Sequence, residues 1–132
     1  MSDQTITVRI GCSDKRVQSK MRTHMADQGW PEDSYYVQDH AGGPIFIEEA
    51  QHTLGVLFTN LPEDVEKVVV IYSHQDCAAC KKRYGSDIVS KHIEHLRQGY
   101  CWVTDRYASV RVRLFFLHQN SNDDWPVERV FV

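Results

Sequence analysis

The sequence predicts an α/β fold with three layers, in which helices flank a mostly parallel β-sheet whose last strand runs antiparallel. Two observations support this prediction. Segments rich in β-branched residues alternate along the chain with segments whose apolar residues recur every three or four positions. The central segment 65–73 (VEKVVVIYS) is almost continuously apolar, which is typical of a strand covered on both faces. Together they indicate a Rossmann-like sheet with right-handed crossovers.

The strands are predicted from short apolar or alternating segments. The segment TITVRI alternates, the segment SYYVQ is short, and SVRVRLFFLHQ is long and rich in apolar residues. The final segment VERVFV follows the turn cluster SNDDWP, so we expect it to pair antiparallel with its neighbour. The predicted strands are 5–10, 34–38, 65–73, 109–119 and 127–132.

The helices are predicted from apolar stripes and from the residues that end them. The predicted helices are 15–28, 46–58 and 78–98. Gly29 and Pro31 follow the first, and the glycine loop 40–44 precedes the second. Gly99 is expected to end the third. The apolar stripes are Val17, Met21 and Met25; Phe46, Ile47, Ala50, Leu54, Leu57 and Phe58; and Ile88, Val89, His92, Ile93 and Leu96.

Length and composition indicate one globular domain over 1–132. The chain has 132 residues, of which 42% are hydrophobic and 25% charged, with a net charge of −3. This balance argues against a nucleic-acid-binding protein, which would carry a basic excess. No apolar run reaches the roughly 20 residues that span a bilayer, and the first residues lack a signal-peptide pattern. We therefore expect a cytoplasmic protein with no nucleic-acid or membrane partner.

Polar clusters with metal-binding residues follow two of the predicted strands. The segment GCSDKR begins at the end of the first strand, and SHQDCAAC follows the third. In α/β sheets, ligands bind beyond the carboxyl ends of strands, where the strand order reverses. If these two strands are neighbours, the two clusters meet.

The two clusters together hold a candidate zinc site. Cys12 offers one thiolate, while His74 and Cys77 offer an imidazole and a second thiolate from one turn. Three protein ligands leave a fourth tetrahedral position open, as in catalytic zinc sites. Asp14 could fill that position, or it could turn away and pair with Arg16. The position then takes a water, whose pKa zinc lowers to about 7.

These motifs resemble those of the β-class carbonic anhydrases. CSDKRV is similar to the family's C-x-D-x-R element, and SHQDCAAC to its H-x-x-C element, in the same order and about sixty residues apart. YYVQDHAGG resembles the strand and glycine loop between them, and EEAQHTLGV resembles the helix that follows. The likeness extends from about residue 6 to residue 118.

The resemblance implies a function and an assembly. Cys12, His74 and Cys77 would bind Zn²⁺, while Asp14 and Arg16 would form the catalytic dyad that opens or closes the site. A zinc-bound hydroxide would attack carbon dioxide and give bicarbonate. The family also implies a homodimer, or a multiple of dimers, in which the partner chain completes the pocket.

The chain departs from the family pattern at several positions. It begins almost at the first strand, so we expect the family's N-terminal helices to be absent. Ala78 and Ala79 replace a glycine pair, and Asp39 and His40 replace an Arg-Asn pair. Lys15 replaces a small hydroxyl residue. These changes bear on substrate access and turnover rather than on zinc binding.

Cys80 leaves three interpretations open. It could be a spectator thiol, which we favour, a redox partner of Cys77, or a fourth ligand that closes a Cys₃His structural site. The closed site would suit a non-catalytic zinc domain used for assembly or binding. An open site would also suit hydrolysis of carbonyl sulfide or carbon disulfide.

The other candidate residues are expected to have no role at the site. We expect His92 and His95 to be half-exposed helix residues and Cys101 to be packed near a helix end. His40 is a weak candidate for handling protons, because imidazole titrates near neutral pH. A loop position without a role is favoured for it.

Overall fold

The computed structural model describes residues 4–40, 42–62, 64–85, 88–121 and 123–132, without the side chains at 45, 46 and 84. Its centre is a five-stranded sheet in the order β2-β1-β3-β4-β5. Pairing is parallel except between β4 and β5, which is antiparallel. The predicted fold class is therefore confirmed. The strands are β1 (Thr5–Gly11), β2 (Tyr36–Asp39), β3 (Glu66–His74), β4 (Val110–Leu117) and β5 (Val127–Val130).

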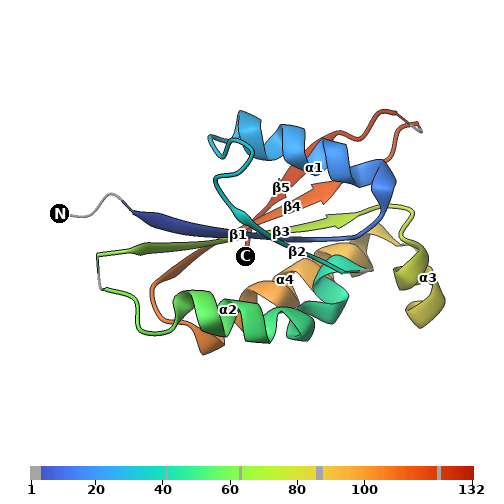
Figure 1. Cartoon of the computed structure of the whole chain (residues 1–132). Helices are drawn as coiled ribbons and strands as arrows, with labels where there is room; N and C mark the ends of the chain where they lie inside the picture. The colour runs from blue at the N-terminus through green and yellow to red at the C-terminus, as the bar shows by residue number, and fades with distance from the viewer. Residues whose placement is uncertain (1–3, 41, 63, 86–87, 122) are drawn as a thin grey trace.

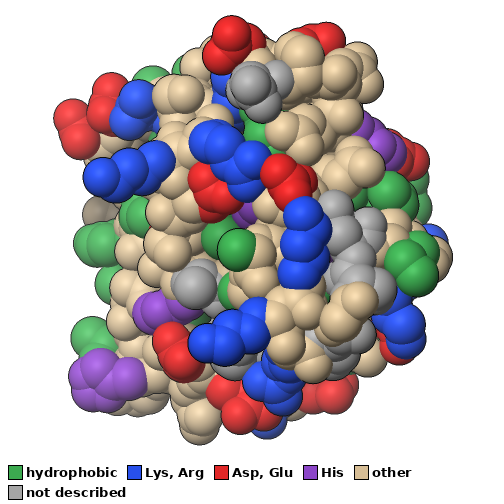
Figure 2. All heavy atoms as spheres, turned by 90° about the vertical axis from the view of Figure 1, so that its right-hand side faces the viewer, with side chains coloured by type: hydrophobic (Ala, Val, Ile, Leu, Met, Phe, Trp, Pro, Cys, Tyr) green, Lys and Arg blue, Asp and Glu red, His purple; other side chains and the backbone are tan. Residues whose placement is uncertain are grey.

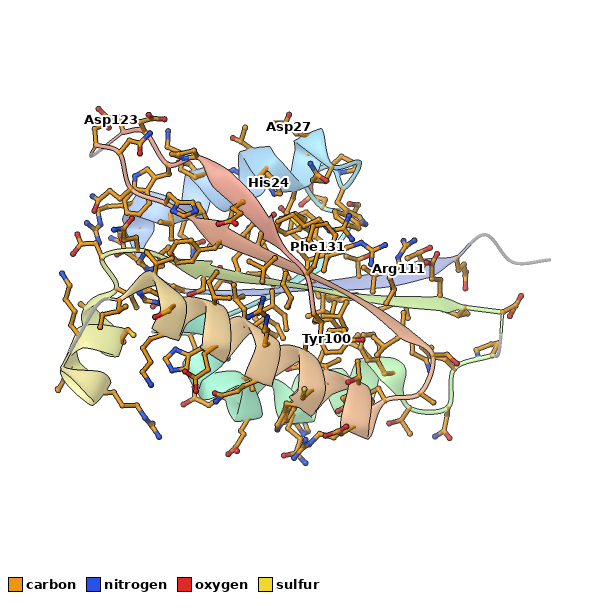
Figure 3. The ribbon with its side chains drawn as sticks, turned by 180° about the vertical axis from the view of Figure 1, so that it is seen from behind. His24, Asp27, Tyr100, Arg111, Asp123 and Phe131 are labelled. Carbon is orange, nitrogen blue, oxygen red and sulfur yellow. The ribbon has the colours of Figure 1, made fainter. Side chains whose placement is uncertain are left out.

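Helices cover both faces of the sheet (Figure 1). Helix α1 lies on one face, and α2 and α4 lie on the other. Figure 3 shows the same arrangement from behind, with His24 on α1 and Tyr100 on α4 on opposite sides of the strands. The helices are α1 (Lys15–Asp27), the 3₁₀ helix η1 (Gly43–Ala50), α2 (Gln51–Phe58), α3 (Ala78–Tyr84) and α4 (Val89–Arg106).

The strand order creates a switch point between β1 and β3. The chain leaves β1 through α1 on one face to reach β2, and then returns on the other face through η1 and α2 to reach β3 (Figure 1). Crevices at the carboxyl ends of such strands are the usual ligand sites of open α/β sheets. Because β1 and β3 are neighbours, the two polar clusters predicted at their ends do meet.

Each face of the sheet has its own buried core. On the α1 side, the apolar stripe of Val17, Met21 and Met25 packs against β3 and β4 and is fully buried. On the other side, residues of η1, α2 and α4 pack against the central strands, with Leu54 and Leu96 fully buried. Within the described residues, no helix combines the length and the apolar character needed to cross a membrane.

The second predicted helix begins earlier than expected. A 3₁₀ helix starts at Gly43 and α2 follows it, instead of one helix over 46–58. Pro44 lies in the first turn, where its missing N–H costs no hydrogen bond. The predicted burial of Phe46 lies outside the described residues.

The predicted single helix 78–98 is wrong. Gly85 has a φ of 69° and ends α3 in the left-handed conformation, and α4 starts only after Ile88. The prediction of helix at 86 and 87 lies outside the described residues. Gly99 does not end a helix either, because it lies inside α4. A Cβ there would come within 3.3 Å of Ile71 Cδ1 and 3.4 Å of Ile47 Cδ1, so this glycine lets the helix approach the sheet closely.

Candidate metal centre

Three potential metal ligands converge at the carboxyl ends of β1 and β3. Cys12 directly follows β1, His74 is the last residue of β3, and Cys77 is the N-cap of α3. Their ligand atoms all lie within 4.8 Å of one another, and all three residues are buried. Figure 2 faces this end of the molecule, where Lys and Arg side chains are interleaved with Asp and Glu side chains. The three residues proposed from the sequence as zinc ligands are thus brought together.

The imidazole of His74 is oriented for a ligand at Nε2. Its Nδ1 lies 2.6 Å from the carbonyl oxygen of Gln75. Because a carbonyl oxygen can only accept a hydrogen bond, Nδ1 carries the proton and donates. This contact leaves the lone pair on Nε2, which is buried and has no hydrogen-bond partner among the described residues. A carbonyl that fixes the tautomer in this way is common behind metal-bound histidines. Burial acts to lower the pKa of His74, but the adjacent Cys12 sulfur, the Gln75 carbonyl and the Asp14 charge together outweigh it and raise the pKa.

The two thiols of the cluster favour one negative charge. The contact with Cys77 lowers the pKa of Cys12 despite burial, and His74 and the Gly42 amide add to this effect. The Gly42 N–H donates to Cys12 Sγ at 3.3 Å. The same contact raises the pKa of Cys77, so the proton stays on that residue. A thiolate on Cys12 is the form that binds a metal ion.

The glycine loop is fitted closely against the end of β1. Gly43 has a φ of 56°, and a Cβ there would lie 3.0 Å from the Tyr72 carbonyl oxygen and 3.3 Å from the Cys12 nitrogen. Any other residue would push this loop away. The loop therefore holds the Gly42 amide against Cys12.

Asp14 and Arg16 form a direct ion pair beside the cluster. Arg16 Nε lies 3.2 Å from both carboxylate oxygens of Asp14, and its Nη2 lies 2.7 Å from Oδ2. The Arg16 backbone N–H also donates to Asp14 Oδ1 at 2.9 Å, so Asp14 caps α1. These contacts lower the pKa of the Asp14 carboxyl group, mainly through the Arg16 side chain.

Asp76 is a further member of this network that the sequence analysis missed. Arg16 Nη1 donates to Asp76 Oδ2 at 2.7 Å, and Nη2 donates to the Asp76 carbonyl oxygen at 2.8 Å. Lys81 pairs with the other carboxylate oxygen. Arg16 and then Lys81 lower the pKa of Asp76 to about 2. The signal available in the sequence was its position between His74 and Cys77, in the segment predicted to meet the one that contains Arg16.

A buried polar network supports the end of β1 from the α1 side. Arg9 and Asp39 form a salt bridge of 2.6 Å, with side chains only 5% and 9% exposed. Gln18 Nε2 lies 2.8 Å from the same carboxylate oxygen and 2.7 Å from the Cys12 carbonyl oxygen. Asp39, one of the departures from the family pattern, is therefore tied to the backbone of Cys12.

Of the remaining candidates, His40 lies in the loop after β2 as expected, whereas Cys101 does not match its prediction. His40 Nδ1 lies 3.0 Å from Glu49 Oε2, and its backbone carbonyl accepts from the Ser13 amide. Cys101 is exposed within α4, so the expectation of a packed thiol near a helix end is wrong.

Cys80, His92 and His95 form a second cluster. Their ligand atoms also lie within 4.8 Å of one another. His92 is 1% and His95 5% exposed, so the expectation that both are half-exposed is wrong. The single predicted helix would have held Cys80 and His92 about 18 Å apart along its axis, at 1.5 Å per residue. The end of α3 at Gly85 allows the chain to turn back and bring them together.

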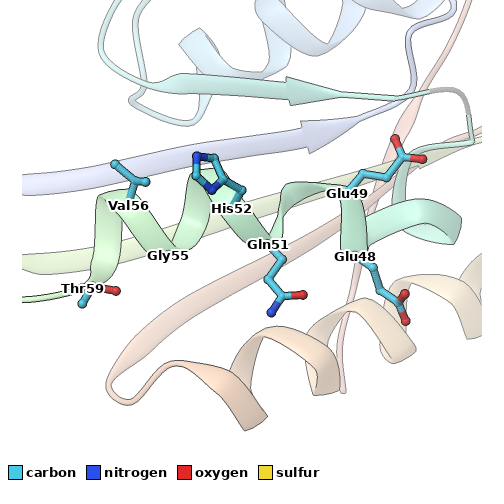
Figure 4. Close-up of a pocket in the computed structure, with 7 residues that line it drawn as sticks. All are labelled: Glu48, Glu49, Gln51, His52, Gly55, Val56 and Thr59. Carbon is cyan, nitrogen blue, oxygen red and sulfur yellow. The ribbon is translucent and has the colours of Figure 1, made fainter.

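A separate shallow hollow lies along the outer side of η1 and α2 (Figure 4). It shares no residue with either Cys/His cluster. Its lining residues are Glu48, Glu49, Gln51, His52, Gly55, Val56 and Thr59.

Comparison with known proteins identifies a similar fold. The crystal structure of carbonic anhydrase from Streptococcus mutans superposes on this chain with a TM-score of 0.54 and 12% sequence identity. The match covers 95% of this chain and 81% of the other. No protein-family model matches the chain, and no curated protein matches it. The chain therefore has a carbonic anhydrase-like fold.

Proposed function

We propose that this chain is a zinc-dependent carbonic anhydrase, which interconverts carbon dioxide and bicarbonate. The observation that carries the proposal is the convergence of Cys12, His74 and Cys77 at the switch point of a carbonic anhydrase-like fold. The Asp14–Arg16 pair beside the cluster supports a site whose fourth position is open. We further propose that the enzyme is cytoplasmic and works as a homodimer or a multiple of dimers.

The donor set suits zinc. Two sulfurs and an imidazole nitrogen are typical zinc ligands, and the buried Nε2 of His74 has no other partner among the described residues. Cys12, His74 and Cys77 would hold the ion. Zinc bound there supplies Lewis acidity, which lowers the pKa of a coordinated water to about 7.

The neighbouring residues keep the site open. Asp14 is the nearby carboxylate in the C-x-D-x-R element, and Arg16 binds it through three side-chain contacts. Arg16 is itself held by Asp76 and lies 5.4 Å from the centre of the Trp125 ring. An arginine fixed on three sides can keep Asp14 turned away from the ligands. The dyad thus controls whether the fourth position belongs to a carboxylate or to a small molecule.

The direct test is carbon dioxide hydration by stopped flow on zinc-loaded protein, at about pH 7 and about pH 8.5. We expect hydration above the buffer rate for the wild type and for Cys101→Ser, which alters an exposed thiol outside the cluster. Cys77→Ser is expected to fall to the buffer rate. A wild-type protein that carries zinc but hydrates no carbon dioxide at either pH would contradict the proposal.

A non-catalytic zinc domain is the second candidate. It is favoured by the burial of the cluster, in which Cys12 is 6%, His74 2% and Cys77 3% exposed. It predicts zinc-dependent stability without turnover.

Hydrolysis of a related small molecule is a further candidate. The same zinc-loaded protein is mixed with carbonyl sulfide or carbon disulfide, which tests whether an open site acts on these molecules instead.

A further inference from the structure

The second Cys/His cluster lies between two helices. Cys80 is on α3, and His92 and His95 are on α4. Their exposed fractions are 0%, 1% and 5%, and their three ligand atoms lie within 4.8 Å of one another. One thiol and two imidazoles in that space are a common donor set for a divalent metal with nitrogen and sulfur preference.

Local structure explains how these residues converge. His92 and His95 are three positions apart on α4, so their side chains share one face of the helix. Gly85 ends α3 in the left-handed conformation, and α4 then presents that face to Cys80. The arrangement depends on a turn between the helices and not on the strand ends that form the first cluster.

The surroundings orient the His92 ring. Its Nδ1 lies 3.3 Å from the Ser73 hydroxyl oxygen, and its ring lies against Phe116, with 5.4 Å between the ring centres. Ser73 and His74 are successive residues of β3, so their side chains point to opposite faces of the sheet. The first cluster therefore uses one face of this strand end, and the second uses the other.

We propose that Cys80, His92 and His95 form a second zinc site, which fastens α3 to α4. On binding, the Cys80 thiol loses its proton to solvent and the two imidazoles bind in their neutral form. The fourth ligand would be a water or another small donor. Cys77 is the N-cap of α3 and Cys80 lies in the first turn, so a metal that anchors this turn would also hold a ligand of the first cluster in place. The second site does not require the first one to be occupied.

Metal content per chain tests the proposal. Full-length wild-type protein, Cys80→Ser and Cys101→Ser are loaded with Zn²⁺, dialysed and analysed by inductively coupled plasma mass spectrometry. We expect Cys80→Ser to retain about one zinc fewer than the wild type, and Cys101→Ser to match the wild type. Cys101 is a matched control because it lies on α4 but outside the cluster. Equal zinc content in Cys80→Ser and wild type would overturn the proposal.

A second measurement keeps the test decisive if Cys80→Ser fails to fold. Cys12→Ser/Cys77→Ser removes both thiols of the first cluster and leaves the second complete. Loaded with Co²⁺, this double variant should show the near-ultraviolet thiolate-to-cobalt band, and the band should disappear when His95→Gln is added. Absence of the band from the double variant would overturn the proposal, because a buried hydrogen-bonded network would then be the better description. Persistence of the band after His95→Gln is added would also overturn it, because the cobalt would then be bound without the proposed ligand set. Loss of carbon dioxide hydration in Cys12→Ser/Cys77→Ser bears only on the first site.

Discussion

The two Cys/His clusters are equally buried but are built in different ways. The first joins residues about sixty positions apart, which meet because β1 and β3 are neighbours in the sheet. Charged side chains that contact one another, Asp14, Arg16 and Asp76, lie beside it. The second joins residues of consecutive helices and has the hydroxyl of Ser73 and the ring of Phe116 as neighbours.

This difference separates a site suited to chemistry from one suited to holding structure. At the first cluster, Arg16 pairs with the nearby Asp14 carboxylate, and under the proposed function this pair would control access to the fourth position. At the second cluster, a metal would connect two helices. Variants at the two places should therefore affect different measurements.

The largest effect on stability is expected from the buried ion pair behind the first cluster. Asp39→Ala leaves Arg9 buried without its carboxylate, which should lower the free energy of unfolding by about 3–5 kcal/mol. It also removes the Gln18 contact next to the Cys12 carbonyl, so zinc affinity should fall at the first cluster more than at the second. Urea denaturation and competitive zinc titration measure the two effects.

Gln38→Ala is the matched control for that variant. Gln38 is the preceding residue of β2, and its side-chain amide contacts only a neighbouring backbone carbonyl among the described contacts. Its effect should stay within about 0.5 kcal/mol. Equal stability of Asp39→Ala and Gln38→Ala would mean that the ion pair does not support the site.

The next effect concerns turnover and rests on the proposed function. Arg16→Ala releases Asp14 and removes the contact to Asp76, so the carboxylate is free to turn toward the ligands. We expect carbon dioxide hydration to fall by about 10–100-fold while the zinc content stays at the wild-type level. Arg22→Ala, which removes an exposed arginine elsewhere on α1, should keep the wild-type rate. Equal rates for the two variants would remove the dyad from the mechanism.

The sequence predicted the first cluster because its signals are local to strand ends. A buried strand, a change to polar residues and the position of His74 and Cys77 identify one half, and Cys12 after the first strand identifies the other. The second cluster was missed because one wrong helix boundary places Cys80 far from His92. Gly85 was the sequence signal for that boundary. A single glycine is weak evidence for the end of a helix when apolar residues at helical spacing follow it, so the pattern predicts one continuous helix. Asp76 was missed because the meeting of two segments does not show which of their charged side chains will contact one another.

Gly85→Ala tests the turn on which the second cluster depends. Space is not limiting among the described residues, since none of them beyond the chain neighbours has an atom within 4 Å of a Cβ at this position, but its φ of 69° is unfavourable for alanine. We expect a loss of about 1–2 kcal/mol in the free energy of unfolding and a weaker second metal site, with the first site little changed. Gly55→Ala is the control. Gly55 also has open space but lies within α2, where alanine should raise the free energy of unfolding by roughly 0.5–1 kcal/mol. Two variants that change stability in the same direction would contradict this account.

The smallest effect on stability is expected at His24. This histidine belongs to neither cluster, so it serves as a reference for the histidines of both. Burial lowers its pKa, and Nδ1 lies 2.6 Å from the Tyr72 hydroxyl group, whose own pKa is raised by burial, so that hydroxyl stays protonated and donates. Phe115 packs on the ring, and Asp27 opposes the shift only in part.

The lowered pKa makes the contribution of His24 to stability depend on pH. Because the unfolded chain binds the proton more tightly, this contribution is complete above about pH 6.5 and declines as the pH falls below it. His24→Gln should therefore be less stable than the wild type at about pH 7.5, and the gap should narrow at about pH 5 when both proteins are compared in the same metal state. A gap that stays constant between these pH values would show that the His24 ring contributes through packing alone.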